Sequence, residues 1–212
     1  MKKVFALFLA LTILAAAGLV SADSLEFVPG TPDACSPESF LDFFSSIAQE
    51  SGFTFTWDEA PAEEDNYSVY TGASADGLMS VRIYIQGDNV SHVVALGEVT
   101  LDPTDSESAY TFGQWFGVAI SGSAISMSLG AGNTDVVTNP DLSEKLNTDI
   151  MPLMNLLTVD FDEEHLSAGK AAATTILGYP CGMEVSGGTD GSKVLLSMKV
   201  IVCSQDGQFS VR

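Results

Sequence analysis

The first hydrophobic pattern of the chain is that of a helix followed by a strand. Ser36 is suited to cap a helix, and Pro37 is suited to its first turn. The side chains that follow recur at intervals of three or four residues and form one apolar face: Phe40, Phe43, Phe44 and Ile47. Gly52 is suited to end this helix. Residues 53–57 then alternate strictly between apolar and polar, which predicts a half-buried strand.

An antiparallel meander is predicted after an acidic loop at 58–66. Alternating apolar residues indicate strands at about 67–72, 78–86 and 90–101. The first two strands are joined by a turn that contains Asp and Gly, as hairpins favour, and the last two by the turn at 87–89. One face of this sheet is therefore expected to be buried.

Beyond Pro103 the pattern becomes helical. No charged residue occurs over 108–134, where large apolar side chains are mixed with small ones, and this predicts a helix over about 106–129. A second helix is expected after Pro140. Pro152 is expected to kink or break it, because proline cannot donate the helical hydrogen bond.

The end of the chain completes an α+β pattern. The Ala-rich segment 163–177 indicates a third helix, and strands at about 182–187 and 193–203 follow it. This order predicts an α+β fold with one or two antiparallel sheets and the helices packed on one face. Residues 23–212 are expected to form a single compact unit.

Two hairpins resemble each other, which leaves open that the unit consists of two related α+β halves, 23–135 and 136–212. At 70–85 and again at 185–202, a strand leads through a Gly-rich turn with Asp-Gly into an apolar strand. The alternative interpretation is that hairpin turns need Gly and Asp in any case, so that the similarity requires no duplication.

The N-terminus has the pattern of an export signal. Lys2 and Lys3 precede an uncharged stretch over 4–22, which ends in small residues and is followed by Asp23. This pattern predicts a secretory signal peptide, residues 1–22, cleaved near Ala22, and the short basic region suits a bacterial signal. A retained membrane anchor is the alternative, since the stretch is long enough to span a bilayer. We therefore expect a secreted, cell-envelope or periplasmic protein with no membrane contact after cleavage.

The charge balance excludes some partners. The chain has 212 residues, 28 acidic and 8 basic, and a net charge of −20. An electrostatic nucleic-acid binder is excluded because phosphates require clustered Lys and Arg, and docking on an anionic membrane is disfavoured for the same reason. With 46% hydrophobic residues the chain can form a core, which argues against disorder.

The three cysteines, Cys35, Cys181 and Cys203, allow at most one internal disulfide in an exported chain. Counting back from a turn near Asp190 places residue 181 opposite residue 199 or so, which disfavours a bridge between Cys181 and Cys203. Pairing of Cys35 with either partner stays open. No C-x-x-C spacing occurs, so a zinc or thioredoxin-type site has no support.

Five candidate metal-ligating residues lie close together in the sequence: Asp160, Asp162, Glu163, Glu164 and His165. Carboxylates of this kind bind hard cations such as calcium and raise the pKa of a neighbouring histidine. The favoured interpretation is that acids gather in the first turn of a helix, with Asp162 as its N-cap, because the helix dipole attracts them. No cofactor is therefore expected, and calcium is the alternative.

The remaining motifs have simple structural interpretations. Ser167 and Lys170 fit the S-x-x-K pattern of penicillin-binding enzymes, but the companion motifs are missing and we expect a solvent-facing lysine on a helix. Gly113 and Gly117 are expected to let a helix lie close to a sheet rather than to dimerise in a membrane. The other histidine, His92, is expected to be half-buried and structural.

The sequence thus favours a secreted or cell-envelope binding module with no catalytic residues, whose partner is a protein or another extracellular ligand. A basic partner is left open, because the acidic loop 58–65 either recognises one or only keeps the protein soluble. The alternatives are an exported hydrolase built on paired carboxylates and a calcium-dependent surface protein that uses 58–65 or 160–164.

Overall fold

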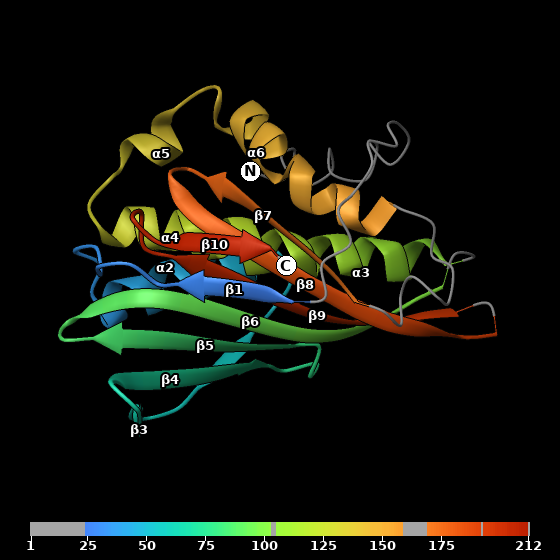
Figure 1. Ribbon diagram of the computed structural model, residues 1–212, viewed down its shortest axis with the longest axis horizontal. Coiled ribbons are helices and arrows are strands. Elements are labelled where there is room, and N and C mark those ends of the chain that lie inside the picture. Colours follow the sequence, from blue (N-terminus) through green and yellow to red (C-terminus); the bar gives the residue numbers. More distant parts are fainter. Residues whose placement is uncertain (1–23, 103–104, 159–168, 192, 212) are drawn as a thin grey trace.

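The fold is α+β, as the sequence predicts, and consists of an antiparallel sheet with helices on one face and a two-stranded ribbon on the other. The computed structural model describes residues 24–102, 105–158, 169–191 and 193–211. Figure 1 shows the ribbon in front of the sheet and helices behind it. We call the helix-covered face the inner face and the ribbon-covered face the outer face.

The main sheet has eight strands and joins the two halves of the chain. The strands are β2 (Phe55–Trp57), β3 (Ala62–Glu64), β4 (Tyr67–Ser74), β5 (Met79–Gln86), β6 (Asn89–Leu101), β7 (Lys170–Ile176), β8 (Tyr179–Asp190) and β9 (Lys193–Cys203). Their order is β2-β4-β5-β6-β9-β8-β7, and β3 also pairs with β4. All these pairs are antiparallel, and the long pairing of β6 with β9 lies at the centre.

The ribbon consists of β1 (Leu25–Val28) and β10 (Gln208–Val211) and covers part of the outer face. A small apolar cluster holds it there, with Leu25, Val94, Ala171, Ile201 and Cys203 buried and Phe27, Tyr84, Ala173 and Phe209 packed against them. At Gly182 a side chain would collide with Leu25 and Phe209, so glycine allows the ribbon to lie directly on the sheet.

The helices are α2 (Pro37–Glu50), α3 (Ser106–Gly117), the π-helical turn η2 (Val118–Gly122), α4 (Ser123–Gly130), α5 (Asp135–Thr138) and α6 (Leu142–Thr158). The predicted cap is confirmed, since the Ser36 side chain accepts a hydrogen bond of 3.2 Å from the Ser39 backbone N–H. The long helix predicted from the uncharged stretch is also confirmed, because η2 links α3 and α4 without a gap. α6 continues past Pro152 without a break.

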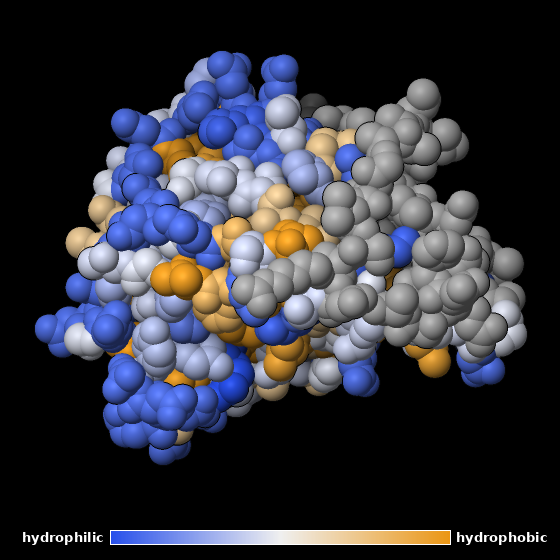
Figure 2. All heavy atoms as spheres, viewed as in Figure 1, coloured by the Kyte–Doolittle hydropathy of each residue, from blue (hydrophilic) through white to orange (hydrophobic). Residues whose placement is uncertain are grey.

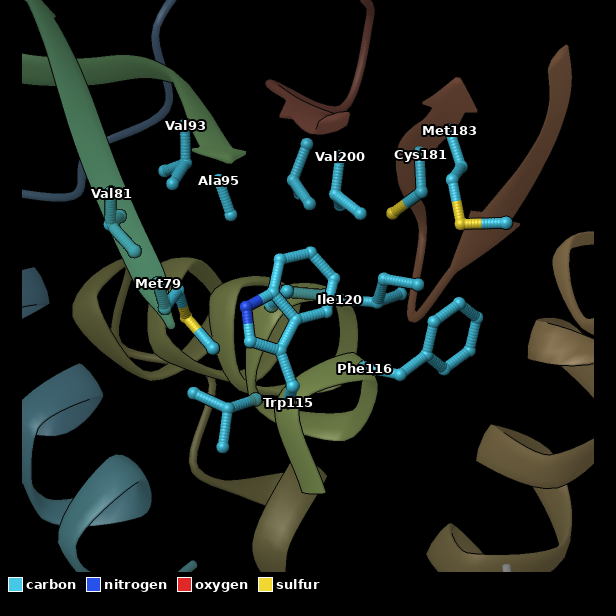
Figure 3. Packing of buried hydrophobic residues seen from close by; sticks show 14 of the residues in the cluster. Met79, Val81, Val93, Ala95, Trp115, Phe116, Ile120, Cys181, Met183 and Val200 are labelled. Carbon is cyan, nitrogen blue, oxygen red and sulfur yellow. The ribbon is translucent and has the colours of Figure 1, made fainter. Parts of the chain in front are cut away.

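The inner core is organised around Trp115, which is fully buried between the helix and the sheet (Figure 3). Its indole N–H donates a hydrogen bond of 3.0 Å to the Leu78 backbone carbonyl. The indole lies against Gly97 of β6 so closely that an added Cβ there would overlap the ring. A strand glycine is therefore required where the backbone and the indole meet.

The predicted third helix is wrong over residues 170–176, which form strand β7; residues 163–168 lie outside the described residues. Leu177 and Gly178 have φ of 55° and 89° and connect β7 to β8 as a two-residue turn. Positive φ at both positions is the geometry that antiparallel hairpins favour, and Gly178 accommodates it at no steric cost. Sheet pairing with β8 thus overrides the helical preference of the alanines.

Three smaller predictions also need correction. The segment 58–66 is not wholly a loop, because β3 pairs there with β4, and the strand predicted at 53–57 begins only at Phe55. Cys181 lies opposite Val202, not residue 199, because β8 and β9 continue to the pair Asp190–Lys193 before they turn.

The sheet is symmetric in its order, with β4-β5-β6 on one side of the centre and β9-β8-β7 on the other. α2 precedes the first three strands, and α6 precedes the last three. The two similar hairpins do not occupy equivalent places in this order. The hairpin at 70–85 joins β4 and β5, the first two strands of the first half, whereas the hairpin at 185–202 joins β8 and β9, the last two strands of the second half. The duplication of 23–135 and 136–212 therefore stays a prediction.

Candidate functional site

A groove of about 610 Å³ lies on the outer face, over the part of the sheet beyond the ribbon. Strands β5, β6, β8 and β9 form most of its floor. The lining residues whose side chains point outward are Ser80, Leu96, Glu98, Glu184, Ser186, Ser197 and Lys199. Figure 2, which views the outer side, shows apolar residues near the centre of the molecule and hydrophilic residues to their left, above and below.

The outward direction of these side chains follows from strand alternation. Along β6 and β9, alternate residues such as Val99 and Met198 are buried in the inner core, so their neighbours point to the outer face. Register then places three rows of residues across β6, β9 and β8: Leu96, Lys199 and Glu184; Glu98, Ser197 and Ser186; Thr100, Leu195 and Gly188. The floor is thus built from short polar side chains between longer ones.

The charged groups of the groove are not equally engaged. Lys199 donates a hydrogen bond of 2.9 Å from Nζ to Oε2 of Glu184, and the Leu25 backbone N–H donates one of 2.7 Å to Oε1. Both oxygens of Glu184 are therefore used, and the Lys199 charge is compensated. Glu98 is exposed, and no described residue forms an ion pair with it. Among the described lining residues, Glu98 is thus a carboxylate without an ion pair, and Lys170, at the edge strand β7, is a lysine without one.

Two apolar side chains lie on either side of Glu98. Leu96 is 40% exposed and Leu195 is 45% exposed, whereas neighbouring inward residues such as Leu196 are buried. Exposed leucines in a sheet face with a hollow beside them can contribute apolar contact area to a ligand. Leu96 and Glu98 therefore line the groove, and Leu195 adds an exposed apolar side chain on the same face, opposite Thr100 and outside the groove lining.

His92 is more deeply buried than the sequence predicts, with 4% of its surface exposed. Its ring stacks on Tyr84 at 4.2 Å between ring centres, and Phe27 and Tyr67 contact it edge-on. Burial in this aromatic box lowers its pKa to about 4. The structural interpretation of His92 is consistent with this environment, which gives a solvent-borne substrate no access to the ring.

All three cysteines are free thiols and are buried. Burial raises the pKa of Cys35 to about 12, with Asp33 adding to the effect, and burial alone raises that of Cys203 to about 12. The pKa of Cys181 is raised too, mainly by burial. Cys181 faces the inner core and Cys203 the outer cluster, which is incompatible with a direct bridge between them. Thiols held protonated in this way are poor nucleophiles.

The candidate metal ligands Asp160, Asp162, Glu163, Glu164 and His165 lie outside the described residues, as does Ser167 of the S-x-x-K pattern. Lys170 of that pattern is the first residue of β7, so the helix expected to carry it is absent at this position.

Carboxylates of the segment 58–65 bind different partners and do not converge on one site. Asp58 accepts a hydrogen bond of 3.3 Å from the Thr71 backbone N–H, and Glu64 pairs with Arg82. Across the described ranges, no three His, Cys, Asp or Glu residues lie together as a metal site would require. No helix within those ranges combines the length and the apolar character needed to cross a bilayer.

Sequence reasoning missed the groove residues because they come from strands far apart in the chain. Ser80, which lies opposite Leu96 on β5, and Glu184, at the far end of the first row, are separated by about half the sequence. Only the strand register brings them together, and no local motif records it. Comparisons with protein-family models, with curated proteins and with solved structures found no match to the chain.

Proposed function

We propose that the protein is a secreted or cell-envelope binding module without catalytic chemistry, and that the groove on the outer face is its ligand site. The observation that carries this proposal is the part of the outer face that the ribbon does not cover. The ribbon covers one part with an apolar cluster, and beyond it lie exposed leucines, serines and Glu98, a carboxylate that has no ion-pair partner among the described residues. A surface of this composition suits recognition of a partner.

The described thiols and His92 lie outside the groove. The thiols and His92 are buried away from the groove, with their pKa values moved toward the uncharged forms. Within the groove, Glu184 is engaged by Lys199 and the Leu25 backbone. The carboxylate hydrolase and the calcium-dependent surface protein stay alternatives, and neither is favoured by a contact of the described residues.

A peptide selection tests the proposal. The exported protein, immobilised, is used to select binders from a phage-displayed library of random peptides. Selected peptides are then measured against Ser197→Trp, which fills the groove floor, and against the control Ser46→Trp on the exposed side of α2. Circular dichroism and thermal unfolding establish that both variants fold.

We expect peptides that bind the wild type and Ser46→Trp but have lost affinity for Ser197→Trp. If no peptide is selected, or if the selected peptides bind Ser197→Trp as well as the wild type, the groove is not the ligand site and the proposal fails.

A further inference from the structure

We infer that the groove binds an extended polypeptide segment that carries Lys or Arg between two apolar residues, at alternate positions along the segment. This inference rests on the proposed function and specifies its ligand. It follows from the spacing of three exposed side chains, Leu96, Glu98 and Leu195, and from the lack of an ion-pair partner for Glu98 among the described residues.

The spacing fits an extended chain. Glu98 lies two residues beyond Leu96 on β6, and Leu195 lies opposite Thr100, four residues beyond Leu96. At about 3.3 Å per residue these positions are roughly 7 and 13 Å from Leu96 along the strand direction. Alternate side chains of an extended ligand have the same period of about 7 Å and point to the same side. Residues i, i+2 and i+4 of a ligand can therefore reach Leu96, Glu98 and Leu195 in turn.

The charges select the middle residue of the ligand. Lys199 is held by Glu184, and the Leu25 backbone N–H occupies the other Glu184 oxygen, so neither charge is available. Glu98 has no ion-pair partner among the described residues and is exposed. A ligand cation opposite Glu98 gains an ion pair, whereas an anion there meets repulsion. The net charge of −20 adds long-range attraction for a basic segment.

The floor leaves room for such a segment. Ser197 and Ser186 lie beside Glu98 across β9 and β8, and Gly188 lies beside Leu195. These are small residues, and nothing lies within 4 Å of the position where Gly188 would carry a Cβ. The ligand's side chains can thus approach the sheet between the leucines, and the serine hydroxyls are available to its polar groups.

Synthetic peptides test the inference directly. The probe is acetyl-Thr-Leu-Thr-Lys-Thr-Leu-Thr-amide, labelled for fluorescence anisotropy, and the comparison peptides replace its Lys by Glu or by Met. Each is measured against the wild type, Glu98→Gln, Glu98→Lys and the control Glu50→Gln, an exposed glutamate at the end of α2. We expect the Lys peptide to bind the wild type more tightly than the Glu and Met peptides do.

The variants should separate the ion pair from general attraction. Glu98→Gln should weaken the Lys peptide about two- to fivefold, the range for an exposed ion pair, while Glu50→Gln should leave its affinity unchanged. Glu98→Lys should reverse the preference in favour of the Glu peptide. Equal binding of the Lys and Glu peptides to the wild type, or no effect of Glu98→Gln, would overturn the inference.

Other outcomes also discriminate. Selected peptides that need the open groove but contain no basic residue would overturn this inference and leave the proposed function standing, whereas unchanged binding by Ser197→Trp overturns both. Sedimentation that shows a dimer lost in Ser197→Trp would assign the groove to a second copy of the chain. Groove-dependent binding to phosphatidylcholine vesicles would assign it to lipid, and either result overturns the inference.

Discussion

Replacing His92 by phenylalanine should change how stability depends on pH, and the size of the change follows from the aromatic box. Tyr84, Tyr67 and Phe27 surround the ring, which is almost fully buried, and Cys203 lies opposite it on β9. The pKa of His92 is lowered from 6.5 to about 4 because burial disfavours the charged imidazolium. The unfolded chain keeps the ordinary value.

The sign follows from proton uptake. Above pH 6.5 both states have neutral His92, and the group's contribution to stability is fully present. As the pH falls below 6.5, the unfolded chain binds a proton that the folded protein excludes, so the free energy of unfolding decreases. The loss is complete near pH 4 and amounts to about 3 kcal/mol, of which about 2 kcal/mol is lost at pH 5.

Urea denaturation of the wild type and His92→Phe at pH 7, 6, 5 and 4 measures this effect. Both proteins share the 28 acidic residues, so the difference between their free energies of unfolding isolates the histidine. We expect the free energy of unfolding of the variant minus that of the wild type to rise by about 2 kcal/mol between pH 7 and pH 5. This rise does not depend on how much the two proteins differ in stability at pH 7. If the free energies of unfolding of the two proteins depended on pH in the same way, folded His92 would bind protons like an exposed histidine. That result would refute the burial of His92 in the aromatic box.

Three further predictions concern the core and the predicted export signal. Gly97→Ala should lower the free energy of unfolding, measured by urea denaturation, by about 1–3 kcal/mol, because the added methyl group meets Trp115. The control Gly188→Ala should lower it less, because the space around Gly188 is open. Equal losses in the two variants would contradict the packing at Gly97. Tyr179→Phe should be nearly neutral or slightly stabilising, because Gln205 and Ser128 lie near its buried hydroxyl without forming a well-aligned hydrogen bond with it. A loss of more than about 1.5 kcal/mol would show that one of these contacts is a stabilising hydrogen bond. N-terminal sequencing of the protein from the expressing cell's envelope or medium should begin at Asp23, and an intact N-terminus would contradict cleavage.

Local periodicity was enough to predict most of the fold. The apolar spacing after Ser36 predicted α2, and the uncharged stretch predicted the long helix of α3, η2 and α4. Alternation with turn residues predicted the hairpin and the strand of β4, β5 and β6. In these elements local preference and burial agree, which is why the sequence pattern is informative.

The errors occur where long-range pairing decides the structure. β7 is Ala-rich and helical by preference, but its pairing with β8 and the turn at Leu177 and Gly178 make it a strand. β1 and β10 are four residues each and pair with one another from opposite ends of the chain, so neither is long enough to show a period. The groove has the same origin, because its rows are assembled by register across strands.

Nuclear magnetic resonance of the isotope-labelled protein, titrated with the peptide acetyl-Thr-Leu-Thr-Lys-Thr-Leu-Thr-amide, tests the assignment of the groove as the ligand site most directly. We expect amide shift changes concentrated in the row of Leu96 and in the row that Glu98 shares with Ser197, and we expect these changes to be lost in Ser197→Trp. Shift changes centred on the acidic segment 58–65 or on the exposed side of α2, with the groove rows unaffected, would contradict it.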